Sequence, residues 1–381
     1  MVCTPMESVV ECFEDIEDPR VEGRCAHRLT AIMGVALCAI ISGADNWVEV
    51  EQYGQAKEGW LRTFLELPHG IPSHDTFGRM FARIEPEQFR EGFLAWVRQL
   101  YARLVGTEEA IAIDGKTLRR SHDGNQDPLH LVSAWATRCR LVLGQIATED
   151  KSNEITAIPH LLDMLDLTDC VVTIDAMGCQ RAIAKQIVEQ GGDYLLQVKG
   201  NQPILHDRLQ NLFVSLQEGE EPEEEVEVAH SVDKGHGRIE TRYGWVVTDE
   251  DWLRYLQRDP HRERWHGLRS VIRVRRRRRI DSQVSEEDTY YISSLSGDAQ
   301  RILALVRGHW GVENGLHWVL DIAFREDESR VRVGQGAENL ALLRHLATNL
   351  LKQETTAKIG IRAKRMRCGW DHRYLRKVLS V

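Results

Sequence analysis

Residues 111–121, IAIDGKTLRRS, join an apolar segment to a cationic one, a combination that is seldom seen. The alternating apolar residues at the start predict a strand that faces the interior of a sheet. That strand ends on Asp114, and a cationic turn with Lys116, Arg119 and Arg120 follows directly. A carboxylate in this position predicts a site at the edge of a sheet, where the ligands of α/β proteins collect.

A second stretch, residues 170–176 (CVVTIDA), ends in the same way on Asp175. Hydrophobic alternation predicts the further strands of this region, at residues 129–138, 140–149 and 193–200. Helical segments before and after the Asp175 strand complete a pattern typical of an α/β fold with a mixed sheet covered by helices. Both acids are then expected to converge at one edge of the sheet. The alternative is that each simply forms a turn.

The chain divides into five regions that differ in predicted structure. In order they are an N-terminal helical region associated with the core (1–105), the first part of the sheet core (106–202), a β-rich insertion (203–297), a helical second part of the core (298–353) and a basic tail (354–381). In the first region Arg79 and Arg83 lie on one predicted helix. That helix either contacts DNA or belongs to a bundle that caps the sheet, and the bundle is the favoured alternative.

A net charge of −9 over 381 residues does not by itself suggest a nucleic-acid partner. Its distribution does, because six of the seven residues from Arg273 to Arg279 are arginine and residues 358–377 hold eight Lys or Arg against one acid. A solvated strand and a disordered tail are the alternatives for these two clusters. The residues predicted to contact DNA are Lys116, Arg119, Arg120, Lys199, Arg275, Arg277, Lys364 and Arg365.

The cysteines and the apolar stretches indicate a cytoplasmic protein. The eight cysteines form no CxxC pair and no secretory leader precedes them, so reduced thiols are expected. The longest apolar stretch, residues 31–44, is shorter than the roughly 20 residues that a membrane-spanning helix needs. It is predicted to be a buried helix.

A third acid is predicted from helical periodicity in residues 305–324, LVRGHWGVENGLHWVLDIAF. At about 100° per residue, Glu313 shares one face with a largely apolar set of residues. These are Val306, His309, Trp310, Leu316, His317 and Leu320. Glu313 is therefore expected to point towards the sheet, where it needs a cation. The candidates are an ion pair with Arg307 or Arg325, or a metal ion shared with Asp114 and Asp175.

Three oxygen ligands without cysteine suit Mg²⁺ or Mn²⁺, and two such ions can support an in-line phosphoryl displacement. Two other motifs are rejected. The segment DGKT lacks the glycine of a phosphate loop, since Ala110 occupies that position. His309, Glu313 and His317 have the wrong order for the usual zinc helix, and ring contacts with the neighbouring tryptophans are favoured.

Long motifs of this chain resemble one known family. They are AIDGKTLRRS, HLVSAWAT, VVTIDAMGCQ, GGDYLLQVKGNQP, HGRIETR, RGHWGVENGLHWVLDIAFRED and AENLALLRHLATNLL, preceded by LPHGIPSHDTFGRMF. Together they resemble the H-repeat-associated (ISAs-type) transposases of bacterial insertion sequences and the N-terminal associated region of that family. The resemblance covers roughly residues 18–353 in order.

The resemblance implies a ribonuclease-H-like core with three catalytic, metal-binding acids, which correspond to Asp114, Asp175 and Glu313. It also implies that the β-rich stretch before Glu313 is an insertion domain. The wider superfamily carries a Tyr, Arg, Glu, Lys signature around its third acid. The matching positions here are Val306, His309, Glu313 and Leu320. Three of the four differ, so the phosphate contacts of that signature do not carry over, and Arg307, His309 or Lys199 are the candidate substitutes.

The function that follows from the resemblance is DNA transposition. The protein would bind the inverted repeats of its element, hydrolyse a phosphodiester at each end with two Mg²⁺ or Mn²⁺ ions, and join the 3′-hydroxyl to target DNA. A homodimer is expected when two ends are paired, in the cytoplasm at the nucleoid and without a membrane. A catalytically silent DNA-binding remnant and a metal-dependent nuclease without strand transfer are the alternatives.

Overall fold

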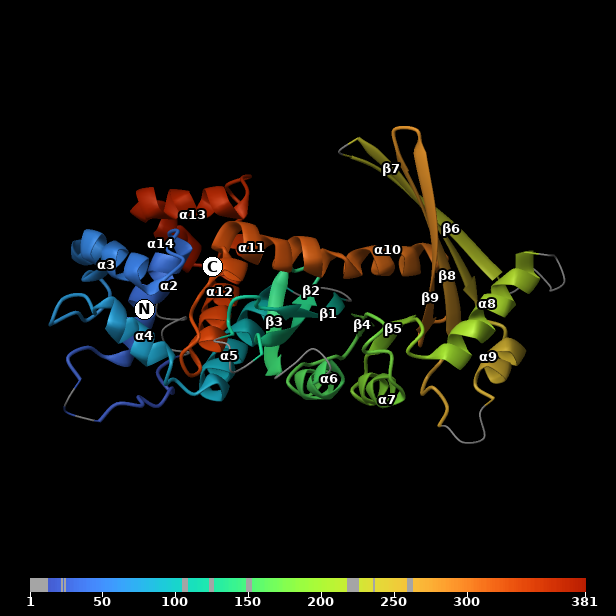
Figure 1. The fold of residues 1–381 in the computed structure, drawn as a ribbon, viewed down its shortest axis with the longest axis horizontal. Helices are drawn as coiled ribbons and strands as arrows, with labels where there is room; N and C mark the ends of the chain where they lie inside the picture. Colours follow the sequence, from blue (N-terminus) through green and yellow to red (C-terminus); the bar gives the residue numbers. More distant parts are fainter. Residues whose placement is uncertain are drawn as a thin grey trace. The chain divides into compact units, whose positions relative to one another are not determined.

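The computed structural model describes residues 13–21, 23, 25–104, 109–122, 127–148, 153–217, 226–235, 237–258 and 263–381. Most of the acidic block at 218–227 lies outside the described residues. The chain forms two compact units (Figure 1). The first unit comprises residues 1–105, 115–153 and 313–381, and the second comprises 106–114 and 154–312.

The first unit is mainly helical. Its helices are α2 (Leu29–Ile41), α3 (Trp47–Leu61), α4 (His74–Phe81), α5 (Pro86–Leu104), α11 (Trp318–Phe324), α12 (Gly336–Gln353), α13 (Ile361–Trp370) and α14 (His372–Leu379). Asn46 caps α3 and Ser73 caps α4, each by accepting a backbone N–H of the first turn. The apolar stretch 31–44 lies in and after α2, whose residues are nearly all buried. Among the described helices none is long and apolar enough to cross a bilayer.

Helix α12 is central to the first unit, and its residues from Asn339 to Leu351 are all buried. It packs against α2, α5, α13 and α14 and against strand β3 (Leu141–Thr148). The Asn349 amide accepts the N–H of Val142 at 2.8 Å and donates to its carbonyl at 2.9 Å. Because β3 ends the strand order, this amide satisfies polar groups of an edge strand that would otherwise lack a partner.

The strands of the first unit follow the order β3-β2-β1, and those of the second follow β1-β4-β5-β9-β8-β7-β6, with β1 common to both. Their bounds are β1 (Glu109–Thr117), β2 (His130–Ala136), β4 (Cys170–Ile174), β5 (Asp193–Val198), β6 (Val226–Gly235), β7 (Arg238–Val247), β8 (Ser270–Ile280) and β9 (Gln283–Ser293). Strands β1, β4 and β5 are parallel, whereas β9, β8, β7 and β6 add in antiparallel fashion. The predicted mixed α/β fold is therefore confirmed.

The β-rich stretch 203–297 continues this sheet, because β9 pairs with β5. The helices of the second unit are α6 (Glu154–Asp163), α7 (Arg181–Glu189), α8 (Pro203–Gln217), α9 (Glu250–Leu256) and α10 (Ala299–His309). Helix α10 packs on β4, β6 and β7. The core there is formed by Val171, Leu195, Val246, Ile272, Val274, Tyr291, Leu295, Ile302, Leu303 and Val306, among others. The far halves of β8 and β9 are exposed and extend beyond the helices (Figure 1).

The predicted basic tail consists of helices α13 and α14, which pack against α12. Lys364 and Arg365 are only 5% and 3% exposed, so the prediction that they contact DNA is wrong. Lys364 donates to the carbonyl of Leu351, near the end of α12, at 2.8 Å. Arg365 donates to the carbonyls of Ile40 and Ala44, at the end of α2, at 2.9 Å each. Carbonyls at helix C-termini lack intrahelical partners and favour cations, which explains why two basic side chains turn inward.

Glu354 joins the ends of α12 and α14. Its buried carboxylate accepts the Tyr374 hydroxyl at 2.7 Å and the backbone N–H of Thr356 at 3.0 Å. Burial alone would raise the pKa of the Glu354 carboxyl, but hydrogen bonds from Thr356, Tyr374 and Ala357 outweigh it and lower the pKa to about 2. The ionised carboxylate therefore stabilises the folded state.

Glu354→Gln should remove this contribution. The depressed pKa stabilises the fold fully above about pH 4.3, the ordinary value for Glu, and the effect is lost as pH falls towards the folded-state value. We expect the difference in free energy of unfolding between wild type and variant to shrink by roughly 2 kcal/mol from pH 6 to pH 3. Denaturant titrations at the two pH values measure it. Glu58→Gln, which removes an exposed i,i+4 pair with Arg62, is the control and should change stability by no more than about 0.5 kcal/mol at either pH.

Candidate active site

Two carboxylates lie at one edge of the sheet in the second unit. Strands β1 and β4 are parallel neighbours, and Ile113 lies opposite Ile174 in their register. The next residues, Asp114 and Asp175, therefore lie side by side on chains about 5 Å apart. Asp175 is the first residue after β4, whereas β1 continues through Asp114 to Thr117, so the prediction that the first strand ends on Asp114 is wrong. Both residues are half-buried.

The loop after β4 orients Asp175. Its Oδ1 atom accepts the N–H of Met177 at 2.9 Å, a local turn that holds the carboxylate in place. The turn after β5 supports the same loop, because Asn201 donates to the carbonyl of Ala176 and Gln202 to that of Cys179. Gly178 lies directly over Ile174, where a Cβ atom would collide with the isoleucine side chain. Glycine is thus required for the close return of this loop.

His309, at the end of α10, lies beside this pair. Its Nδ1 atom is 3.0 Å from the hydroxyl of Thr173, two residues before Asp175 and on the same face of β4. Burial lowers the pKa of the His309 imidazole, against the opposing effect of the Asp175 carboxylate. The ring is therefore neutral at pH 7 and offers one donor or acceptor, according to tautomer, without adding charge.

Glu313 opens a π-helix, Glu313–His317, and belongs to the first unit. Its side chain is exposed, so the expectation that it shares the buried face is wrong. The π-helix changes the angle per residue at this point, which invalidates a helical wheel drawn at constant pitch. Gly315 packs against the ring of Trp135, whose nearest atom is 3.2 Å from the place that a Cβ atom of residue 315 would occupy.

The two arginines considered as partners of Glu313 pair elsewhere. Arg307 forms an ion pair with Asp233 at 2.7 Å in the second unit, and Arg325 pairs with Glu328 in the first. Glu313 is thus not explained as half of either predicted salt bridge.

Lys116 belongs to a buried ion cluster of the first unit, not to an exposed surface. Its ammonium lies 2.5 Å from Asp321 and 2.6 Å from Glu326, and its side chain is 11% exposed. Burial disfavours the ammonium, yet the carboxylates of Glu326 and Asp321 outweigh this and raise the pKa of Lys116. Arg344 of α12 lies 3.7 Å from Glu326. The predicted DNA contact by Lys116 is therefore wrong, because its charge holds β1 to the segment after α11.

Arg119, Arg120 and Lys199 are exposed, as a contact with DNA requires. The Arg119 side chain is 80% exposed and lies 3.2 Å from Asp327, a surface pair that water weakens. Arg120 receives a hydrogen bond at its carbonyl from Arg332, at 2.8 Å. These three residues remain predicted DNA contacts.

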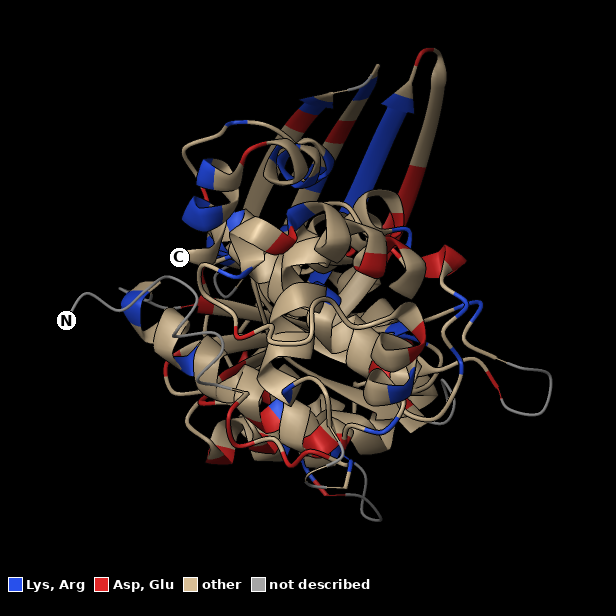
Figure 2. Cartoon of the chain, turned by 90° about the vertical axis from the view of Figure 1, so that its left-hand side faces the viewer, with Lys and Arg blue, Asp and Glu red and all other residues tan. Residues whose placement is uncertain are grey.

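The arginines of β8 are paired with acids of β9. Arg275 makes two hydrogen bonds of 2.8 Å to Asp288, and Arg277 lies 3.4 Å from Glu286. Figure 2 shows the basic stretch of this strand beside acidic stretches. Arg273, nearest the core, lies over the ring of Trp245 with its guanidinium carbon 4.0 Å from the centroid. The charge of this strand is thus largely neutralised within the sheet, which weakens the prediction that Arg275 and Arg277 contact DNA.

Asp114 and Asp175 offer the hard oxygen ligands that Mg²⁺ and Mn²⁺ prefer. In the described part of the chain, no three side chains of His, Cys, Asp or Glu are gathered closely enough to hold a metal ion. A metal site at this pair, completed by Glu313, therefore stays a prediction. The pattern VVTID contained one signal that we did not use: Thr173 lies at i−2 from Asp175 and so shares its face of the strand.

The sequence matches known families over nearly its whole length. Residues 106–350 match the family described as "Transposase DDE domain", and residues 10–97 match the family described as "DDE_Tnp_1-associated". The "H repeat-associated putative transposase YhhI" of Escherichia coli (strain K12) is 38% identical over 382 residues, which cover 98% of each chain. A protein of Xanthobacter autotrophicus, "Uncharacterized protein in dhlA 3'region", is 46% identical over 289 residues, 75% of this chain and 94% of its own.

A solved structure of the piggyBac transposase synaptic complex with hairpin DNA covers 98% of this chain and 78% of its own, with a TM-score of 0.41 and 10% identity. That likeness is too low to support a statement about the fold. The family match and the full-length identity to YhhI are sufficient without it. The chain belongs to the transposases that carry a DDE domain, together with the associated N-terminal region of that family.

Proposed function

We propose that this chain is an active DNA transposase of an insertion sequence. It hydrolyses a phosphodiester at each end of its element and transfers the freed 3′-hydroxyl to target DNA. The observation that carries this proposal is the register of β1 and β4, which sets Asp114 and Asp175 side by side at one sheet edge. Carboxylate oxygens are the ligands that Mg²⁺ and Mn²⁺ prefer, and this supports a divalent cation at the pair.

In this proposal Asp114, Asp175 and Glu313 hold two Mg²⁺ or Mn²⁺ ions. When bound, these ions activate the attacking oxygen and stabilise the leaving oxygen of an in-line displacement. The hydrogen bond from Met177 orients Asp175, and the neutral His309 adjoins it without competing as a cation. Arg119, Arg120 and Lys199, which are exposed, contact the DNA backbone.

We also infer a ribonuclease-H-like core made of β1 to β5 with the helices around them. Support comes from the combination of parallel strands β1, β4 and β5 with the antiparallel pair β2 and β3. The location is the cytoplasm, at the nucleoid. Two copies pair when two element ends are brought together, because each end needs its own set of acids.

Asp175→Asn should abolish DNA cleavage by removing a metal ligand while keeping the shape of the side chain. The substrate is a plasmid that carries the DNA flanking the coding sequence on both sides, with Mg²⁺ present. We expect cleavage to fall by at least about a thousandfold, from removal of an essential ligand. The control is Asp169→Asn, at the other end of β4, where an exposed Asp has φ +57° and Asn is well tolerated. If the Asp175 variant cleaves as fast as this control, the proposed active site is wrong.

Strand transfer separates a transposase from a nuclease. A preprocessed element end with a free 3′-hydroxyl should yield covalent joints to a target plasmid, detected by sequencing across the new junctions. The reaction should require the divalent ion and fail with Asp114→Asn. Cleavage of full-length ends without any joint from preprocessed ends would favour the metal-dependent nuclease. Binding without either reaction would favour the silent remnant.

A further inference from the structure

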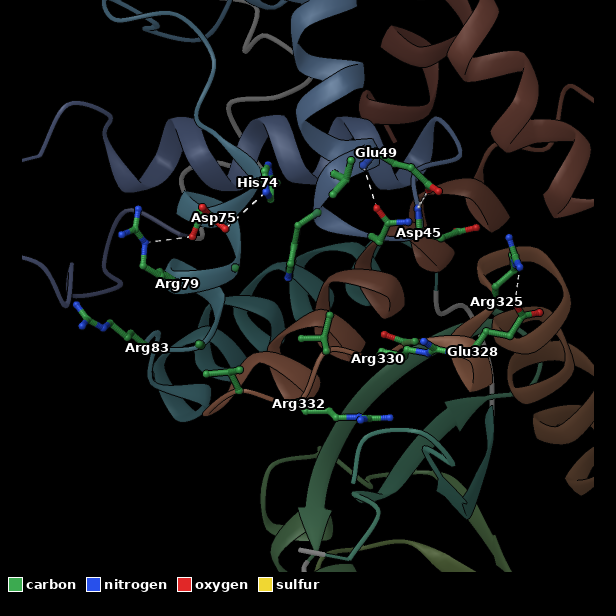
Figure 3. A pocket seen from close by; sticks show the side chains of 18 residues that line it. Asp45, Glu49, His74, Asp75, Arg79, Arg83, Arg325, Glu328, Arg330 and Arg332 are labelled. Carbon is green, nitrogen blue, oxygen red and sulfur yellow. Dashed lines mark hydrogen bonds and ion pairs between the residues drawn. The ribbon is translucent and has the colours of Figure 1, made fainter. Parts of the chain in front are cut away.

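A cleft of about 810 Å³ lies entirely within the first unit. One wall is α4, the other is the segment 329–333 that follows α11, and the N-terminal turn of α3 closes one side (Figure 3). We call it the α4 cleft. It shares no residue with the candidate active site. Its lining includes Arg79 and Arg83, for which the sequence left open a contact with DNA or a place in a helical bundle.

The two walls are held at a set spacing. The N–H of Gln335 donates to the carbonyl of Ala82 at 3.1 Å, and the Asn339 amide donates to the carbonyls of Phe81 and Ile84 at 2.8 Å each. Gly334, with φ +53°, approaches Ala82 so closely that a Cβ atom would collide with the carbonyl. The C-terminal end of α4 is thus fastened to the segment opposite, and the cleft is formed before any ligand arrives.

Each wall carries a pair of arginines. Arg79 lies in the last turn of α4, and Arg83 lies in the turn that follows this helix, two residues after Phe81. Arg330 and Arg332 lie two residues apart on the facing segment, at a spacing of about 6 to 7 Å for an extended chain. All four side chains are exposed, and Figure 3 shows them on the two walls.

These arginines have no acidic partner among the described residues. Arg79 donates only to the carbonyl of Asp75 at 3.2 Å, and Arg332 only to that of Arg120 at 2.8 Å. Within the described ranges Arg83 and Arg330 make no ion pair or side-chain hydrogen bond. In contrast, the arginines of β8 face acids on β9. The surplus positive charge therefore lies in the α4 cleft and not on the strand with the most arginines.

The acids that line the cleft do not cancel this charge, because most of them have other partners. Asp45 binds the buried Arg365 at 2.9 Å, and Glu328 pairs with Arg325. Glu49 accepts the backbone N–H of Asp45 at 2.7 Å. Asp75 lies 3.6 Å from the ring of His74. Neither Glu49 nor Asp75 pairs with a Lys or Arg among the described residues, so these two carboxylates oppose the four arginines by two charges.

We propose that the α4 cleft binds the sugar-phosphate backbone of DNA through Arg79, Arg83, Arg330 and Arg332. This rests on the proposed function, which supplies DNA as the substrate. Two pairs of guanidiniums on opposite walls match a repeating anion and not a single phosphate, which would need them to converge on one point. The hydrogen bond from Arg332 to Arg120 continues the basic surface to the turn after β1, so one DNA segment can contact both.

The test is DNA affinity as a function of salt, measured by fluorescence anisotropy with full-length protein and without divalent ions, so that no cleavage occurs. The probes are a labelled 30-base-pair duplex from the flanking DNA, its single strand, and a polyglutamate peptide. The variants are R79Q/R83Q and R330Q/R332Q. The control R62Q/R254Q removes the same charge from exposed arginines that pair with acids of their own helices.

Each cleft variant should bind the duplex at least about tenfold more weakly, and the slope of log affinity against log salt should fall by about 2, one unit per phosphate contact. The control should keep the wild-type slope and lose less than about threefold. An equal loss of affinity for the single strand would mean that the cleft contacts the backbone of one strand. A loss of affinity for the duplex alone would mean that it contacts both strands. Either supports the proposal.

Two results would overturn it. One is a wild-type slope in both cleft variants. The other is loss of polyglutamate binding with DNA binding intact, which would make the cleft a site for an acidic protein segment. DNA cleavage by the cleft variants separates the two proposals. If cleavage still requires Asp175 in these variants, the active site can be right while the cleft assignment is wrong. If the wild type itself binds no DNA, both fail.

Discussion

The register that sets Ile113 opposite Ile174 is the constraint on which the candidate site depends. The carboxyl ends of parallel strands lie at the same edge of a sheet. The register of β1 and β4 is therefore sufficient to place Asp114 and Asp175 next to each other. The supporting parts follow from it: the turn at Met177, the close return at Gly178 and the contact of His309 with Thr173 all hold that edge. A shift of one residue in β4 would turn Asp175 to the other face and lose all three.

The second theme is that pairing, and not abundance, decides which basic residues are available to an anion. Arginines of strand β8 form ion pairs with acids on β9, and Lys116 forms ion pairs with Asp321 and Glu326. Lys364 and Arg365 donate hydrogen bonds to carbonyls at the C-terminal ends of two helices. In the α4 cleft, Arg79 and Arg332 donate only to backbone carbonyls. Their positive charge is therefore available to an anion, unlike that of the paired arginines of β8.

Much of the fold could be predicted because its strands have strong local signals. The runs before Asp114 and Asp175 are apolar, and both form strands as expected, although β1 continues past Asp114 to Thr117. No strand was predicted at β6, where Val226, Val228 and Val232 share one face with His230 and Lys234 and no residue is fully buried. Helix α9 was not predicted, because seven residues are too few to show a helical periodicity.

The orientation of Glu313 and the fate of the basic residues could not be predicted, for two physical reasons. A π-helix changes the helical pitch over a few residues, and no simple periodicity in the sequence predicts it. The burial of Arg365 depends on where α2 ends, more than 300 residues earlier. Contacts of that kind come from packing, which a local pattern does not contain.

The most direct measurement of the central claim is to map the metal with iron. Fe²⁺ bound in place of Mg²⁺, with ascorbate and peroxide, cleaves the polypeptide near the ion, and the fragments are identified by mass. We expect cuts near residues 114 and 175 in the same protein, both suppressed by excess Mg²⁺ and both lost in Asp114→Asn. Cuts at only one of these positions, or cuts that persist in the variant, would contradict a metal site shared by the two strand ends.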